Sequence, residues 1–174
     1  MQFQDWQVTD RISRIRRAYN RQGIRVTIHP HYLEIPFGLI GVGGQVQTIG
    51  VTPMDADFAW IGAMRYPEPE LGADAASMAD PLWGFSLRIT LDPPSRAIGR
   101  HVPVAGSGDR SWCPLNAIAG TGRRPALWAY PILCPGSSRI IVDARNDTDH
   151  EATVFLTLLG AKFYHHGTQA GKAA

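Results

Sequence analysis

Residues 130–164 read YPILCPGSSRIIVDARNDTDHEATVFLTLLGAKFY and contain the pattern that decides the fold. From Arg139 to Arg145 apolar and charged side chains alternate, which is the period of a strand with one buried face. Residues 146–149 are turn formers, because Asn and Asp accept left-handed backbone and bond nearby main-chain groups. Residues 153–164 then form a second run that is apolar on both faces. Such a strand is covered on both sides, so we expect it to lie deep in a sandwich or to contact another subunit.

Similar short runs, separated by turn residues, precede this stretch. We expect strands over 45–52, 57–66 and 85–91, and the 13 prolines and 18 glycines favour short strands over helices. The pattern predicts an all-β protein, an antiparallel β-sandwich of the jelly-roll type. In the strand 57–66 one face is expected to hold Phe58, Trp60, Met64 and Tyr66. The expected core consists of Phe58, Trp60, Phe85, Leu87, Ile89, Ile140, Val142, Leu156 and Leu158.

The first 43 residues differ in composition and are expected to form an N-terminal arm. A short helix is predicted over Thr9–Arg21, with a narrow apolar stripe and a stop at Gly23. Its arginine-rich surface is either a solvated face of a helix packed on its own domain or an arm that docks on an acidic neighbour. Residues 24–40 are extended, and we expect the sandwich to fold without the arm. The predicted division is 1–43 arm, 44–166 jelly-roll sandwich and 167–174 disordered tail.

Three segments carry a resemblance to a known group. They are residues 126–148 (ALWAYPILCPGSSRIIVDARNDT), 154–164 (VFLTLLGAKFY) and 55–66 (DADFAWIGAMRY). The chain resembles tailed-phage virion proteins of the jelly-roll type, in which a Pro-initiated strand, a Pro-Gly-Ser turn and a closing Gly-x-Lys-Phe strand follow one another. The resemblance implies a capsid decoration, cement or minor capsid protein without enzymatic activity, catalytic residues or cofactors.

The same resemblance implies partners and a location. The partners would be further copies of the chain, most simply in a homotrimer, and the major capsid, neck or tail proteins of a phage particle. The protein would be part of the virion, assembled in the host bacterial cytoplasm. The expected capsid contacts on the arm are Arg11, Arg14, Arg16, Arg17 and Arg21. The expected oligomer interface, from the outer face of the last strand, is Phe155, Leu159 and Phe163.

The composition and charge argue against several other classes of protein. A net charge of only +2 gives no general affinity for nucleic acid, so no direct nucleic-acid partner is expected. Neither a signal-peptide core at the start nor an apolar run long enough to span a membrane is visible. Cys113 and Cys134 are expected to be free thiols, as is usual in a reducing cytoplasm.

Two other functions remain open. His29, His31 and Glu34 resemble the first metal-binding motif of cupins, because residues two apart on a strand face the same way. That reading predicts a metalloenzyme, although a second cupin motif is missing and we expect no metal. The other alternative is a receptor- or glycan-binding fibre module, which an exposed tryptophan in a shallow groove would favour. The candidate tryptophans are Trp6, Trp83 and Trp112.

Overall fold

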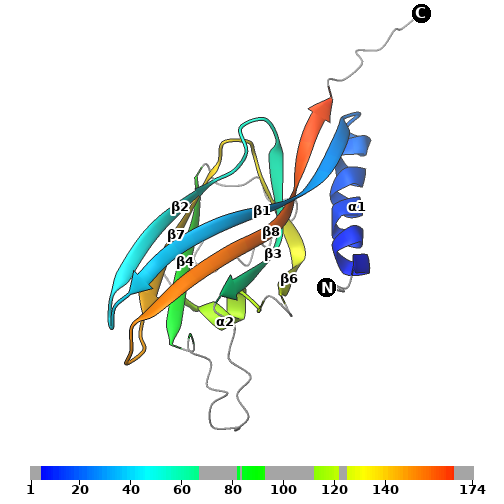
Figure 1. The fold of residues 1–174 in the computed structure, drawn as a ribbon. Coiled ribbons are helices and arrows are strands. Elements are labelled where there is room, and N and C mark those ends of the chain that lie inside the picture. Colours follow the sequence, from blue (N-terminus) through cyan, green and yellow to red (C-terminus); the bar gives the residue numbers. More distant parts are fainter. Residues whose placement is uncertain (1–4, 67–81, 83, 93–111, 122–124, 167–174) are drawn as a thin grey trace, which may run out of the picture.

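The computed structural model describes residues 5–66, 82, 84–92, 112–121 and 125–166, and in these ranges it is a two-layered β-sandwich (Figure 1). Each layer is a four-stranded antiparallel sheet. Sheet A contains, in spatial order, β1 (Arg25–Ile40), β8 (Ala152–His166), β3 (Asp57–Tyr66) and β6 (Ala126–Cys134). Sheet B contains β2 (Gln45–Val51), β7 (Arg139–Asn146), β4 (Phe85–Asp92) and β5 (Cys113–Pro114). The helices are α1 (Asp5–Arg21) and the short α2 (Leu115–Ile118).

The strand order is that of a jelly roll. β1 pairs with β8, β2 with β7, β3 with β6 and β4 with β5, as in one long hairpin that has been rolled up. The pairs β3–β8 and β4–β7 then join these units into the two sheets. Eight strands in this arrangement are the jelly-roll form of the β-sandwich. The predicted fold class is therefore confirmed.

Alternating side chains of both sheets fill the space between them. All nine residues of the expected core are 0 % exposed. On β4, for example, Phe85, Leu87 and Ile89 point inward, and Ile140 and Val142 of β7, its neighbour in the same sheet, point into the same space. The prediction of the core from period-two alternation is confirmed.

The expected turn after β7 is confirmed and is held by one buried amide. The Asn146 side chain donates to the carbonyls of Ile40 and His150, at 3.0 and 2.8 Å, and accepts from the Thr148 amide at 2.9 Å. Its main chain exchanges hydrogen bonds with Gly43 and Gly44 of the β1–β2 turn. Asn146 therefore ties together the two turns at one end of the sandwich, and its polar atoms are satisfied although it is 0 % exposed.

The expected boundary between the arm and the sandwich is wrong. β1 pairs with β8 over its whole length and contributes Ile35, Phe37 and Ile40 to the core. Pro30 and Pro36 are compatible with this strand, because β1 lies at the edge of sheet A. On its free side no neighbouring strand requires a main-chain amide as a donor. The sandwich thus begins at Arg25, after α1. α1 itself begins at Asp5 rather than Thr9 and ends, as expected, before Gly23, whose φ is 73°.

A β-bulge in β3 changes which residues face inward. The register against β6 and β8 shifts between Trp60 and Gly62. Phe58 and Trp60 point into the core, but beyond the bulge Tyr66 is 63 % exposed, so the expected common face of 57–66 is wrong. The bulge requires Gly62, because a Cβ there would lie 2.2 Å from the carbonyl oxygen of Ala126.

Leu87→Ala and Leu156→Ala test the core. Each removes a side chain that is 0 % exposed, and we expect each to lower the free energy of unfolding by about 2–5 kcal/mol. Urea denaturation measures this change. The control is Val42→Ala at a position 61 % exposed, where we expect less than about 1 kcal/mol. Equally small effects at all three positions would contradict the assigned core.

Two truncations test the revised boundary. A chain that begins at Gly23 should keep the β-sheet circular dichroism of the full protein, because α1 lies outside the two sheets. A chain that begins at Leu39 should not fold, because it lacks most of β1 and leaves β8 without one of its two neighbours. Cooperative thermal unfolding of the chain that begins at Leu39 would instead support the boundary predicted from the sequence, between residues 43 and 44.

Candidate interaction surfaces

Helix α1 packs against the outer face of sheet A, at the end where β1 starts and β8 finishes (Figure 1). Its buried side chains, Ile15 and Tyr19, join Val26, Ala161 and Phe163 in a second apolar cluster outside the main core. The Tyr19 and Phe163 rings stack with centroids 5.8 Å apart. Of the two readings of the helix, packing on its own domain is the one this arrangement supports.

Hydrogen bonds to Asp57, which we call the polar anchor, also hold α1 against sheet A. The Tyr19 hydroxyl donates to Asp57 Oδ2 at 2.6 Å, and His165 Nε2 lies 2.8 Å from the same oxygen. The Gly136 amide donates to the other oxygen at 3.2 Å. Burial, followed by the hydrogen bond to and the charge of Asp57, raises the pKa of Tyr19 far above its ordinary value. Tyr19 is thus a neutral hydrogen-bond donor at physiological pH and fixes the helix to β3.

The five arginines expected to bind a coat protein do not form one uniform face. Arg11 is turned toward the sheet, where its Nε donates to the Trp128 carbonyl. Arg14 is exposed and forms an ion pair with Asp10 at 2.7 Å. Arg16, Arg17 and Arg21 are exposed and make no ion pair within the described ranges. The exposed basic surface of the helix therefore consists of Arg14, Arg16, Arg17 and Arg21.

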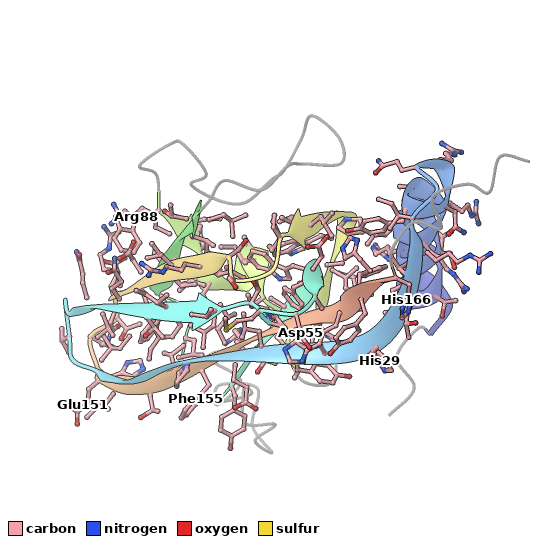
Figure 2. All side chains as sticks on the ribbon, turned by 90° about the horizontal axis from the view of Figure 1, so that it is seen from above. His29, Asp55, Arg88, Glu151, Phe155 and His166 are labelled. Carbon is pink, nitrogen blue, oxygen red and sulfur yellow. The ribbon has the colours of Figure 1, made fainter. Side chains whose placement is uncertain are left out.

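The three residues expected at an oligomer interface have different surroundings. Phe163 is 0 % exposed because α1 covers it, so this part of the prediction is wrong. Leu159 is 5 % exposed, and Phe155 is 41 % exposed. Figure 2 shows Phe155 projecting from the side of the sandwich opposite Arg88. The accessible part of the outer face of sheet A thus lies beyond the end of α1.

Other exposed apolar side chains lie on the same face as Phe155. Its ring centroid is 6.4 Å from that of Tyr66, which is contributed by β3. Leu39 pairs in register with Thr153, two residues from Phe155, and Tyr32 pairs with Leu159. We call these four exposed residues the aromatic face: Tyr32, Leu39, Tyr66 and Phe155, with exposed fractions of 57, 61, 63 and 41 %.

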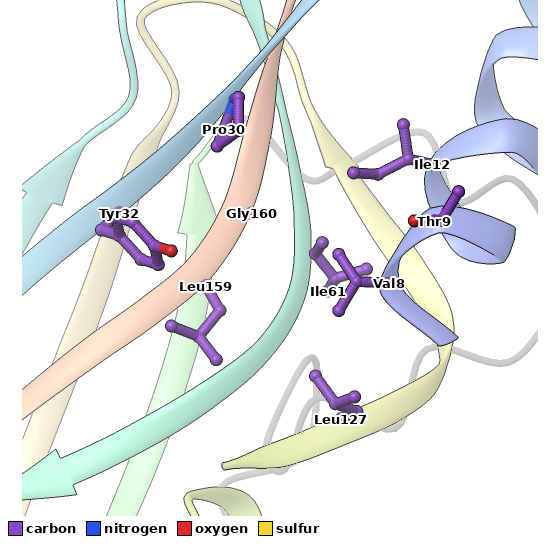
Figure 3. A pocket seen from close by; sticks show the side chains of 9 residues that line it. All are labelled: Val8, Thr9, Ile12, Pro30, Tyr32, Ile61, Leu127, Leu159 and Gly160. Atoms are coloured by element: carbon purple, nitrogen blue, oxygen red, sulfur yellow. The ribbon is translucent and has the colours of Figure 1, made fainter. Parts of the chain in front are cut away.

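Two hollows adjoin the aromatic face. One, of about 300 Å³, lies between α1 and the sheet, and Tyr32 forms part of its wall (Figure 3). The second, of about 250 Å³, has Glu34, Tyr66 and Phe155 in its wall. The residues that line the first hollow are Val8, Thr9, Ile12, Pro30, Tyr32, Ile61, Leu127, Leu159 and Gly160. Nearly all of these residues are apolar, which suits the burial of a hydrophobic side chain from a partner.

A second exposed apolar group was not predicted from the sequence. Ile49 and Val51 of edge strand β2 are 50 and 53 % exposed, and Met54, which follows, is 85 % exposed. We call these three residues the aliphatic edge. The signal was present in residues 45–51, where Val46 and Gly50 point inward and the alternate positions still include Ile49 and Val51.

The histidine cluster expected of a cupin does not assemble. Strand alternation places His29 and His31 on one face of β1 and Glu34 on the other. The His31 ring meets that of Phe58 in the core at 5.8 Å, whereas Glu34 lines the hollow beside Phe155. Burial, and to a smaller extent Lys162, lowers the pKa of His31. Within the described ranges no three His, Cys, Asp or Glu side chains are placed to hold a metal ion.

The glycan-binding alternative depended on three tryptophans, of which Trp112 can be described. The guanidinium carbons of Arg88 and Arg145 lie 5.2 and 4.7 Å from its ring centroid. Asp143 pairs with Arg88 at 2.9 Å, and Asp147 pairs with Arg145 at 2.8 Å. A sugar that stacks on this indole would compete with the two arginines. The side chains of Trp6 and Trp83 lie outside the described residues, as does the tail 167–174.

The two cysteines are free, as expected. Burial raises the pKa of Cys113, and burial together with Asp57 raises the pKa of Cys134 to about 12. Both thiols are therefore protonated at neutral pH, and neither is an activated nucleophile.

Comparisons with protein-family models, with curated proteins and with solved structures found no match to this chain. Neither helix in the described ranges has the length and apolar character that crossing a membrane requires. The case for a function therefore depends on the surfaces described above and on the sequence resemblance.

Tyr19→Phe tests the polar anchor of α1. The substitution removes the hydrogen bond to Asp57 but keeps the ring that stacks on Phe163, and we expect a loss of about 1–2 kcal/mol in unfolding free energy. Limited trypsin cleavage at the helix arginines should also become faster. Tyr32→Phe is the control, because Tyr32 is 57 % exposed. Unchanged stability and unchanged cleavage in Tyr19→Phe would show that the anchor is not needed.

Proposed function

We propose that this protein is a non-enzymatic structural component of a tailed-phage virion, which associates with its own copies and with coat, neck or tail proteins. The observation that carries the proposal is the aromatic face. Three aromatic rings and one leucine, each at least 41 % exposed, lie on one face of a folded sandwich. Exposed apolar groups of this kind mark contacts between proteins. The resemblance of residues 126–164 to virion proteins, and the jelly-roll strand order, support the same assignment.

The basic surface of α1 supplies the second contact. Arg16, Arg17 and Arg21 project from a helix that is itself fixed to the sandwich, so their positions are set before a partner binds. Arginine pairs in a two-pronged manner with carboxylates. A net charge of only +2 does not favour general binding to nucleic acid. The partner that fits is an acidic surface on a coat or neck protein.

Charge substitutions on α1 test this contact. We expect the double variant Arg16→Gln, Arg17→Gln to bind about tenfold more weakly to phage particles that lack the protein, because two exposed ion pairs are lost. Binding of the unaltered protein should weaken as salt is raised, since exposed charge pairs are screened. Co-sedimentation with the particles measures both effects.

The matched control makes the same charge change elsewhere. Val42→Glu, Gln45→Glu also lowers the net charge by about two units at neutral pH, but it does so in the β1–β2 turn region, at the far end of the molecule from α1 (Figure 1). This variant should bind as the unaltered protein does. Equal losses in both variants would point to net charge alone, and full binding by the arginine variant would remove α1 as the anchor.

A further inference from the structure

Seven of the eight exposed large apolar residues in the described ranges fall into two separate groups. The aromatic face belongs to sheet A, and the aliphatic edge belongs to sheet B. Val42, in the turn between β1 and β2, is the eighth such residue and belongs to neither group. Two separate apolar groups on one chain raise the question of which surface each one covers in an assembly.

The two groups point in opposite directions. Ile49 and Val51 follow Gln47 at intervals of two, so they share its face. Gln47 donates to Asp143 at 2.7 Å, and Asp143 pairs with Arg88 on the outer face of sheet B. Arg88 and Phe155 lie on opposite sides of the sandwich (Figure 2). One copy can therefore use both groups at the same time, each with a different neighbour.

The groups also differ in shape and in their charged neighbours. The aromatic face adjoins hollows of about 300 and 250 Å³, whereas Met54 of the aliphatic edge protrudes and is 85 % exposed. Glu34 lies in the wall of the hollow beside Phe155. Arg139 is exposed and is the register partner of Val51. A concave surface with an acidic neighbour faces a convex one with a basic neighbour more favourably than it faces a copy of itself.

We propose that copies of this chain associate head to tail, with the aromatic face of one copy on the aliphatic edge of the next. This inference rests on the self-association in the proposed function and specifies its geometry. A head-to-tail contact can bring Glu34 of one copy toward Arg139 of the next, which a symmetric contact of either group with itself cannot do. A head-to-tail contact is heterologous, so it builds closed rings or open chains of three or more copies rather than a dimer.

Mixing two variants tests this geometry. The face variant carries Tyr66→Thr and Phe155→Thr, and the edge variant carries Ile49→Thr and Val51→Thr. All four positions are exposed strand positions, and threonine suits a strand. Each variant alone should be monomeric by analytical ultracentrifugation, because each lacks one half of every contact. An equimolar mixture should give a 1:1 heterodimer and nothing larger, because only one complete contact can form.

The controls separate this inference from the proposed function. Val42→Thr replaces an exposed apolar side chain that belongs to neither group. This variant should assemble like the unaltered protein. An unaltered protein that stays monomeric at micromolar concentration would overturn the proposed self-association itself. An unaltered protein that stops at a dimer, a mixture of variants that stays monomeric, or either variant assembling fully on its own would overturn the head-to-tail geometry alone.

Discussion

The structure depends on β8, a strand that is paired along both edges and apolar on both faces. β8 hydrogen-bonds to β1 along one edge and to β3 along the other. Its inner face gives Val154, Leu156 and Leu158 to the core between the sheets, and the end of its outer face gives Phe163 to the cluster under α1. Every layer of the molecule is thus connected through β8. The run of apolar residues on both of its faces is the sequence counterpart of that position.

The same strand explains why part of the surface stays apolar. A helix of 17 residues is about 25 Å long, and a strand of 15 residues is about 50 Å long. α1 therefore covers only part of the outer face of sheet A. The hydrogen bond between Tyr19 and Asp57 fixes α1 at the end of β8 where Phe163 lies. Phe155 and Tyr66 therefore remain exposed. The basic helix and the bare aromatic face are consequences of one packing arrangement.

Alternation along single strands was sufficient to predict the core, because it depends only on local period. The spacing of the strands, with turn residues between them, predicted the jelly-roll sandwich. Three features depend on tertiary context and were not predicted. Residues 24–40 were predicted to be extended but were assigned to the arm, and their pairing with β8 in sheet A was missed. Gly62 carries no sign that it forms a bulge, so the reversal of faces before Tyr66 was missed. The sequence alone could not show whether α1 or another subunit covers Phe163. The separation of Glu34 from the two histidines, by contrast, followed from alternation and was available in the sequence.

The pairing of the first strand with the last has a consequence for biosynthesis. Arg25 lies opposite His166, and Ile40 lies opposite Ala152. A ribosome therefore releases β1 and β3 long before the strand that must sit between them exists. During translation the nascent chain exposes unpaired strand edges and the apolar side chains of a future core, and such species aggregate readily. Sheet A can close only after β8 has been synthesised, and topologies dominated by such distant contacts typically fold slowly.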